Sequence, residues 1–140
     1  METLYTAEAL ATGGGRNGQV RTSDGILDLN LAIPKAMGGA GGAANPELLF
    51  AAGYAACFHS ALQSVARAKK IDIQDSSVGS QVSIGPNGNG GFQLAVTLEV
   101  NLPDLDPEVA QSLADAAHQV CPYSNATRGN IDVNVSVVDD

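Results

Sequence analysis

The two cysteines, Cys57 and Cys121, are the side chains of this sequence best suited to covalent chemistry. A cysteine attacks an electrophile only as a thiolate, so the pKa of its thiol decides whether it reacts. Cys57 lies in an apolar segment, where burial would raise that pKa. Most of its neighbours one helical turn away are small and would leave open space beside the sulfur; these neighbours are Gly53, Tyr54, Ser60 and Ala61. A cation about 4 Å away would offset the burial by roughly 4 kcal/mol at an effective dielectric constant of about 20. A reactive Cys57 therefore requires a neighbouring arginine or lysine.

Composition does not decide which cation this would be, because four lie outside the basic end of the first predicted helix: Arg16, Arg21, Lys35 and Arg128. Arg16 stands in a glycine-rich loop and can fold inward most easily. Glu47, an acid that suits the dipole of a helix start, could orient that arginine. The helix from Glu47 to Cys57 would be about 15 Å long. One arginine spans that length only partly, which hints at a site shared between two chains.

Cys121 is the poorer nucleophile of the two. It follows the end of a predicted helix, where the helix dipole disfavours an anion. We therefore assign the attack to Cys57 and the resolution, by disulfide formation, to Cys121. The plain alternative is that both are core residues, since free cysteine is among the most buried residue types.

His59 is not expected to activate Cys57. Two residues along a helix turn a side chain by about 200°, so His59 faces away, and we expect it to be a partly exposed or hydrogen-bonded structural histidine. Cys57, His59, His118 and Cys121 are suitable ligand types for zinc. The same geometry argues against a zinc site, because Cys57 and His59 cannot both face one metal from a regular helix.

The strands are predicted from alternating apolar and polar residues. We expect extended structure at residues 3–10, 19–22 and 26–33, with an Asp-Gly hairpin turn between the last two. Further strands are expected at residues 78–84, 92–102 and 131–138. Hairpins rather than crossovers should connect these strands. The sequence thus predicts an α+β fold with antiparallel sheets, in a single domain covering residues 1–140.

Two helices carry or flank the cysteines. An asparagine cap, a proline and an acid at residues 45–47 begin a helix expected to reach about Lys70. Its middle is apolar all round, which is typical of a core helix. The same signals open a second helix at residues 106–120, and Pro122 prevents its continuation.

The overall composition narrows the function classes. The net charge is -8 with only seven Lys and Arg residues, so nucleic acid is not an expected partner. The N-terminus lacks the basic start and apolar stretch of a signal peptide. We see no uncharged apolar stretch of about 18 residues that would span a membrane. We expect a cytoplasmic protein without a membrane partner, in a compartment where structural disulfides are rare.

Three segments are distinctive enough to indicate a protein family. Residues 45–58 read NPELLFAAGYAACF, residues 121–130 read CPYSNATRGN, and residues 12–18 read TGGGRNG. These segments resemble, respectively, the peroxidatic helix, the resolving-cysteine segment and the arginine loop of the organic hydroperoxide resistance (Ohr) family in the Ohr/OsmC superfamily. The resemblance runs along the whole chain, with both cysteines in register.

The resemblance implies a cysteine-based peroxidase that reduces alkyl and fatty-acid hydroperoxides to alcohols. Cys57 would become a sulfenic acid and then a disulfide with Cys121. Arg16 would hold the Cys57 thiolate, and Glu47 would orient Arg16. The family fold is an intertwined homodimer in which antiparallel sheets wrap two central helices. No bound cofactor or metal is implied, and the co-substrate that reopens the disulfide is a dithiol, notably a lipoyl group on a carrier enzyme.

Three positions depart from the family pattern. Asn17 stands in place of an acid, Gln19 in place of a basic residue and Leu48 in place of a glutamine. None of them removes a catalytic group; they bear on loop closure and substrate preference. Apolar residues around the site should favour organic peroxides, and the sequence offers three: Met37, Phe50 and Phe58.

Three other interpretations compete with this one. An OsmC-like peroxidase of the same superfamily would use similar chemistry, but the compact length and the CPYS segment favour Ohr. A non-enzymatic redox sensor would use the disulfide to change its binding to a partner, and steady-state turnover would separate the two. A carrier of hydrophobic ligands would have cysteines that do not respond to low peroxide doses.

Overall fold

The computed structural model describes residues 1–138, and they form two compact units. The first unit ends at Leu49 and the second begins at Phe50, so the boundary falls inside the first turns of helix α1 (Pro46–Ala68). The expectation of a single domain stays a prediction.

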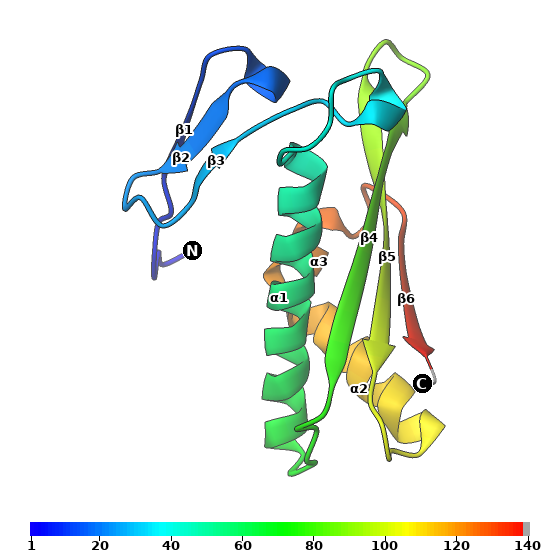
Figure 1. Ribbon diagram of the computed structural model, residues 1–140. Helices are drawn as coiled ribbons and strands as arrows, with labels where there is room; N and C mark the ends of the chain where they lie inside the picture. Colours follow the sequence, from blue (N-terminus) through cyan, green and yellow to red (C-terminus); the bar gives the residue numbers. More distant parts are fainter. Residues whose placement is uncertain (139–140) are drawn as a thin grey trace. The chain divides into compact units, whose positions relative to one another are not determined.

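The first unit contains one antiparallel sheet of three strands in the order β1-β2-β3 (Figure 1). The strands are β1 (Ala9–Thr12), β2 (Gln19–Thr22) and β3 (Asp28–Asn30). The predicted hairpin turn is confirmed. Gly25 donates its N–H to the Thr22 carbonyl at 2.9 Å and has a φ of 77°, a conformation that favours glycine.

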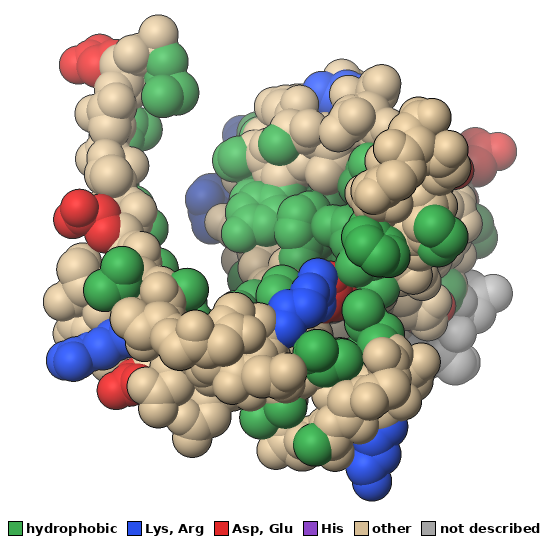
Figure 2. All heavy atoms as spheres, turned by 90° about the horizontal axis from the view of Figure 1, so that it is seen from above, with side chains coloured by type: hydrophobic (Ala, Val, Ile, Leu, Met, Phe, Trp, Pro, Cys, Tyr) green, Lys and Arg blue, Asp and Glu red, His purple; other side chains and the backbone are tan. Residues whose placement is uncertain are grey.

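The first unit has almost no buried side chains. Among residues 1–49, Asn45 alone is buried, at 8% exposure. Many of its large hydrophobic side chains are exposed instead: Met1, Leu4, Tyr5, Leu10, Ile26, Leu27, Met37 and Leu48. Hydrophobic side chains are visible at the surface in Figure 2. Since apolar burial drives folding, this sheet needs a covering surface from outside the unit.

The second unit combines a sheet with three helices. Its strands are β4 (Ser77–Pro86), β5 (Phe92–Asn101) and β6 (Val133–Val138). Its further helices are α2 (Pro107–Val120) and α3 (Pro122–Thr127). The α+β class and both long helices are confirmed, with bounds close to those expected.

The pairing of β6 differs from the prediction. β4 and β5 form an antiparallel hairpin, as expected, but β6 pairs parallel with β5. The reason is the connection: α2 and α3 together carry the chain back to the start of the sheet, which is the crossover that a parallel pair requires. The short helix α3 was not predicted either. Pro122 ends α2 but occupies the first turn of α3, a position that proline favours.

The core of the second unit lies between the helices and one face of the sheet. Alternate residues of β5 point into it, with Val96, Leu98 and Val100 at most 3% exposed. Helix α1 contributes Tyr54, Phe58, Ala61, Leu62 and Ala66, and α2 contributes Ala110, Leu113, Ala114 and Ala117. α1 runs alongside β4 and β5 in Figure 1.

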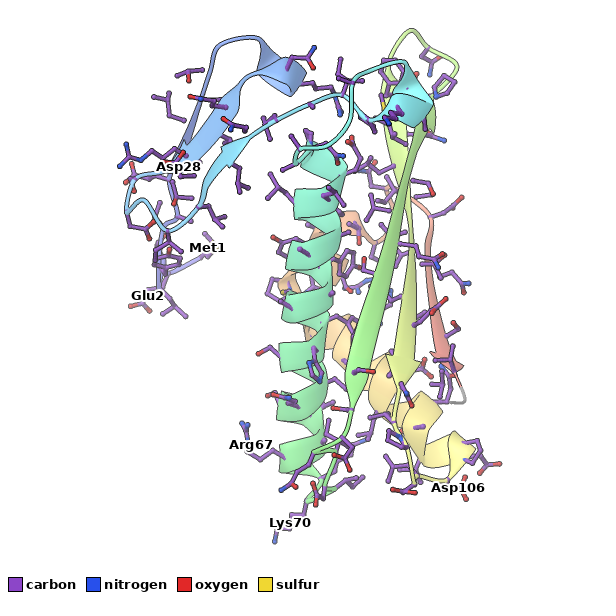
Figure 3. All side chains as sticks on the ribbon, in the orientation of Figure 1. Met1, Glu2, Asp28, Arg67, Lys70 and Asp106 are labelled. Atoms are coloured by element: carbon purple, nitrogen blue, oxygen red, sulfur yellow. The ribbon has the colours of Figure 1, made fainter. Side chains whose placement is uncertain are left out.

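The helix ends follow the predicted capping logic. The side chain of Asp106 accepts the N–H of Glu108 at 2.8 Å at the start of α2, and that of Asn45 accepts the N–H of Leu48 at 2.8 Å at the start of α1. Arg67 lies in the last turn of α1 and Lys70 just beyond it, where cations suit the dipole (Figure 3).

An 18-residue window of α1 has a mean hydropathy of 1.3, so by length and composition this helix could cross a membrane, which differs from the expectation that no segment could. Core helices share this composition. Tyr54, Phe58 and Leu62 of α1 are fully buried in the core of the second unit.

Candidate active site

The two cysteines meet in the second unit. The Sγ atoms of Cys57 and Cys121 are 3.6 Å apart, and both are free thiols. Cys57 is half-buried on α1, whereas Cys121 is completely buried between α2 and α3. The sequence assigned roles to these residues without showing that they touch, and the structure brings them within contact distance.

Cys121 occupies a joint between two helices. Its N–H donates to the carbonyl of Ala117 at 2.8 Å, which ends α2. Its own carbonyl accepts the N–H of Asn125 at 3.0 Å, which begins α3. The backbone of Cys121 is extended, with φ of -60° and ψ of 123°. The joint therefore fixes where the Cys121 side chain starts, independently of the sulfur.

The Cys57 thiol has a raised pKa. Burial is the largest cause, and the neighbouring Cys121 thiol raises the pKa further. The backbone N–H of Tyr123 acts in the opposite direction, because a hydrogen bond to the sulfur favours the thiolate. The balance agrees with the sequence argument that a reactive Cys57 requires a cation.

The space beside Cys57 is not open, contrary to expectation. A Cβ on Gly53 would lie 2.6 Å from the Tyr123 hydroxyl oxygen, so the phenol fills the room that the glycine leaves. The Tyr123 ring also contacts Tyr54 and Phe50, with centroids 5.5 Å and 5.9 Å away. Gly53 thus allows the start of α3 to pack closely against α1.

A groove of about 880 Å³ runs along the second unit next to Tyr123. Phe50, Phe92, Tyr123 and Ile131 form much of its apolar lining. Of the apolar residues expected near the site, Phe50 lines this groove, whereas Phe58 belongs to the buried core. Met37 lies exposed in the first unit.

Arg16 and Glu47 form a two-pronged ion pair within the first unit. Arg16 donates from Nη1 to Oε2 at 2.8 Å and from Nη2 to Oε1 at 2.7 Å. These bonds raise the pKa of Arg16 and lower the pKa of Glu47. A guanidinium held by both prongs has a fixed direction, which is what an orienting carboxylate provides.

Two of the three residues that depart from the family pattern form hydrogen bonds through their side chains, and the third is exposed. Asn17 accepts the N–H of Ile33 at 3.1 Å through its side-chain oxygen, which ties the arginine loop to the segment after β3. Gln19 donates to Asn30 at 3.1 Å across the sheet. Leu48 is exposed at the surface of α1.

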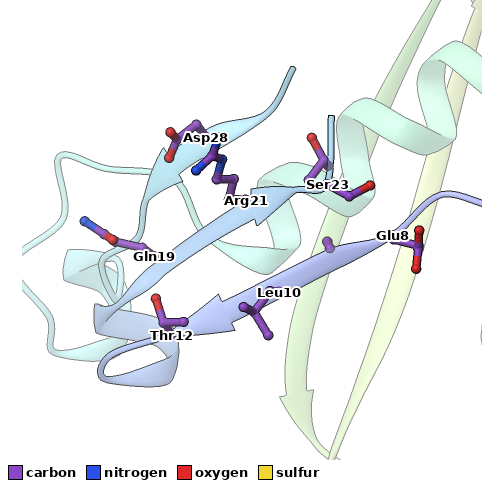
Figure 4. Close-up of a pocket in the computed structure, with 9 residues that line it drawn as sticks. Glu8, Leu10, Thr12, Gln19, Arg21, Ser23 and Asp28 are labelled. Atoms are coloured by element: carbon purple, nitrogen blue, oxygen red, sulfur yellow. The ribbon is translucent and has the colours of Figure 1, made fainter. Parts of the chain in front are cut away.

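The other cations considered lie in different settings. Arg21 lines a hollow of about 750 Å³ on the first unit, together with Glu8 and Asp28 (Figure 4). Arg128 donates to the carbonyl of His118 at 2.9 Å and also binds the Asn125 side chain, at the joint between α2 and α3.

The histidines are hydrogen-bonded. His59 Nε2 lies 3.0 Å from Ser76 Oγ, as expected for a structural histidine. His118 lies 2.8 Å from the buried Ser124 hydroxyl. The part of the chain that the structure describes contains no group of three or more His, Cys, Asp or Glu residues that could hold a metal ion.

Sequence reasoning missed the residues that link the helices around the cysteines. Tyr54 and Ser124, both fully buried, are hydrogen-bonded at 2.8 Å. Each lies one helical turn from a cysteine, and this spacing was the available signal. Spacing places each residue near a cysteine, but it does not show that the two side chains bond to each other.

Comparisons with known proteins match the chain over nearly its full length. Residues 39–136 match the family model described as OsmC-like protein. The organic hydroperoxide resistance protein of Xanthomonas axonopodis pv. citri is 51% identical and covers 97% of this chain and 96% of its own. OhrB of Bacillus subtilis is 50% identical over 96% of this chain and 98% of its own. The crystal structure of an organic hydroperoxide resistance protein from Elizabethkingia anophelis has a TM-score of 0.95 at 52% identity, with both chains fully covered.

The Arg16–Glu47 pair predicts a pH-dependent stability. Glu47 has a pKa below its ordinary value of 4.5, so the pair contributes above that value and the contribution is lost as the pH falls through the lowered pKa. Glu47→Gln should lower the free energy of unfolding by about 0.5–1 kcal/mol near neutral pH, a small effect because Arg16 is partly exposed. The difference from the unmodified protein should shrink in acid. Denaturant unfolding from neutral to acid pH measures this difference in unfolding free energy, with Glu2→Gln as the control. A difference that does not change with pH would contradict the prediction.

Proposed function

Because the chain belongs to the OsmC-like family, we propose that it is a cysteine-based peroxidase that reduces organic hydroperoxides. Its relatives named organic hydroperoxide resistance proteins support a role in hydroperoxide detoxification. The observation that carries the mechanism is the 3.6 Å separation of the Cys57 and Cys121 sulfurs. When one of two thiols this close is oxidised to a sulfenic acid, the other can condense with it to form a disulfide.

The first step would be attack by the Cys57 thiolate on the outer oxygen of the hydroperoxide. The sulfur–oxygen bond forms as the oxygen–oxygen bond breaks, and the alkoxide leaves and takes a proton to become the alcohol. Cys57 is then a sulfenic acid. The Cys121 thiol attacks that sulfur, and the disulfide forms as water leaves. Cys121 suits this role because its burial protects the thiol from the peroxide itself.

A dithiol would complete the cycle. One of its thiolates attacks the disulfide to give a mixed disulfide, and its second thiol displaces the protein. The products are two protein thiols and an oxidised cyclic disulfide. A lipoyl group on a carrier enzyme is a dithiol of this kind, and we propose it as the co-substrate. No bound cofactor is required, because sulfur carries both electrons.

Arg16 is the cation that we propose for the Cys57 thiolate. The requirement comes from burial, which raises the Cys57 pKa. Arg16 is suited to it because Glu47 fixes the direction of its guanidinium. The remaining N–H groups of an arginine held on two prongs can still bind an anion.

Organic hydroperoxides are the proposed substrates because the groove beside Tyr123 is largely apolar. Phe50 and Phe92 can contact an alkyl chain, while the N–H of Tyr123 faces the Cys57 sulfur. Hydrogen peroxide has no apolar part and gains nothing from such a surface.

A homodimer is the assembly that we propose. The first unit has exposed apolar side chains and one buried residue, so it lacks a cover. Four exposed small residues also recur along α1 at every fourth position: Ala52, Ala56, Ser60 and Ser64. Small side chains let two helices approach closely. A second copy, with its own α1 and its own uncovered sheet, meets both needs.

Intact mass tests the cysteine chemistry. The reduced protein treated with one equivalent of cumene hydroperoxide should lose its two thiol hydrogens, and dihydrolipoamide should restore them. Cys57→Ser should not react, because the nucleophile is gone. Cys121→Ser should gain one oxygen without forming an internal disulfide. An unchanged mass of the unmodified protein would favour a ligand carrier, and oxidation without steady-state turnover would favour a sensor.

Alkylation rates test the role of Arg16. In a Cys121→Ser background, the rate at which iodoacetamide modifies Cys57 reports its thiolate fraction. Arg16→Gln should lower this rate at neutral pH by roughly tenfold or more, because the thiolate loses its cation. Arg21→Gln, a loss of the same charge in the same unit, should leave the rate unchanged. The opposite pattern would assign the role to Arg21.

Sedimentation equilibrium tests the dimer. The unmodified protein should have twice the mass of one chain. Ser60→Glu should weaken association roughly a hundredfold, because it places a bulky charge in the proposed helix contact. Ser112→Glu makes the same change at an exposed position of α2 and should not. A protein that is monomeric at high concentration would rule the assembly out.

A further inference from the structure

A buried chain of polar side chains links the three helices of the second unit. Tyr54 Oη lies 2.8 Å from Ser124 Oγ and 3.1 Å from Thr127 Oγ1. Ser124 Oγ also lies 2.8 Å from His118 Nδ1. Tyr54 and Ser124 are fully buried, and Thr127 is 6% exposed. Hydrogen bonds shielded from water in this way hold their partners in one arrangement.

Each residue of this hydrogen-bonded set lies close in sequence to a cysteine or to the helix that carries one. Tyr54 lies on α1 one turn before Cys57, and Ser124 lies on α3 one turn after Cys121. His118 lies in the last turn of α2, one turn before Cys121. Hydrogen bonds therefore connect α1, α2 and α3 through residues that each lie one helical turn from a cysteine.

The available protons give the hydrogen bonds a direction. Thr127 donates to the Ser124 carbonyl at 3.2 Å, and a hydroxyl has a single proton. Tyr54 then donates to Thr127, Ser124 donates to Tyr54, and His118 donates from Nδ1 to Ser124. Only this order satisfies all four contacts. It assigns the Nδ1–H tautomer to His118, whose neutral form is favoured because burial, and then Arg128, lower its pKa.

We propose that Tyr54, Ser124 and His118 are positioning residues for disulfide closure, an inference that rests on the function proposed above. In that step the Cys121 sulfur bonds to the Cys57 sulfur as the Cys57 sulfur–oxygen bond breaks. The hydroxyl leaves with the Cys121 proton as water. The sulfurs must approach from 3.6 Å to about 2.05 Å.

The buried chain keeps that approach short by fixing the start of α3 against α1. In the described part of the structure these three side chains bond to one another and not to a sulfur. They act through the turns that carry the cysteines, so closure should depend on them more than the initial attack does.

Tyr54→Phe is the sharpest test, since it removes one hydroxyl and keeps the ring. Closure after oxidation by cumene hydroperoxide should slow about tenfold, as expected when a buried hydrogen bond is lost. Intact mass after rapid quenching measures disulfide formation, and dimedone labels the sulfenic acid that has not yet formed the disulfide. Dimedone should label more of the Tyr54→Phe variant than of the unmodified protein, while the rate of peroxide consumption should change less than about twofold.

Two control variants separate positioning from stability. Tyr5→Phe makes the same chemical change at an exposed tyrosine and should leave closure unaltered. Val100→Ala removes buried apolar contacts on β5, at a position distant in sequence from the hydrogen-bonded residues. It should lower the melting temperature without slowing closure. Equal slowing in Val100→Ala and Tyr54→Phe would overturn the proposal.

A spectroscopic signature accompanies the kinetic one. Without Tyr54 as acceptor, the Ser124 proton is free to bond to His118 Nδ1. Nitrogen-15 shifts of the His118 ring should therefore change from the Nδ1–H to the Nε2–H tautomer in Tyr54→Phe, and remain unchanged in Tyr5→Phe.

The outcomes distinguish this inference from the function on which it rests. An unmodified protein that does not react with peroxide refutes the peroxidase proposal itself. A reactive protein whose Tyr54→Phe variant closes its disulfide at the original rate refutes only the positioning role.

Discussion

The close packing of α3 on α1 is the contact on which the candidate site depends. Gly53 makes room for it, because a Cβ at this position would lie 2.6 Å from the Tyr123 hydroxyl oxygen and would displace the phenol. With the two helices in contact, a buried cysteine at the end of α2 reaches a half-buried cysteine in the middle of α1. The same packing presents the Tyr123 N–H to Cys57 and forms one wall of the apolar groove. A small residue in one helix thus determines which groups surround the sulfur.

Each unit has one electrostatic feature of its own. The second unit brings the sulfurs together, but in doing so it buries Cys57 and raises its pKa. The first unit contains an arginine whose direction is fixed by a carboxylate. Burial opposes ionisation of the Cys57 thiol, so the peroxidase chemistry proposed above would need a cation such as Arg16 to offset it.

Much of the architecture was predictable from the sequence. The caps at Asn45 and Asp106, the alternation in β4 and β5, and the Asp-Gly turn each have a local cause, and local signals are read directly from residues. The parallel β5–β6 pair was not predictable in the same way, since it depends on where α2 and α3 return the chain. The contact between Tyr123 and Gly53 was not predictable, because small neighbours of Cys57 indicate free space and no local pattern indicates which distant side chain fills it. The tie between Tyr54 and Ser124 was missed for the same reason.

The separation of the two cysteines along the sequence also determines when both are present in the growing chain. Cys57 and Cys121 are separated by 64 positions, and such distant contacts form late because a long loop must first be closed. A ribosome exposes Cys57 well before it has made α3, so the growing chain at first contains one cysteine without the other. Both cysteines are present only once the polypeptide extends past α2. Because of this order of elements, the disulfide chemistry proposed above needs a chain that includes both α1 and the joint between α2 and α3.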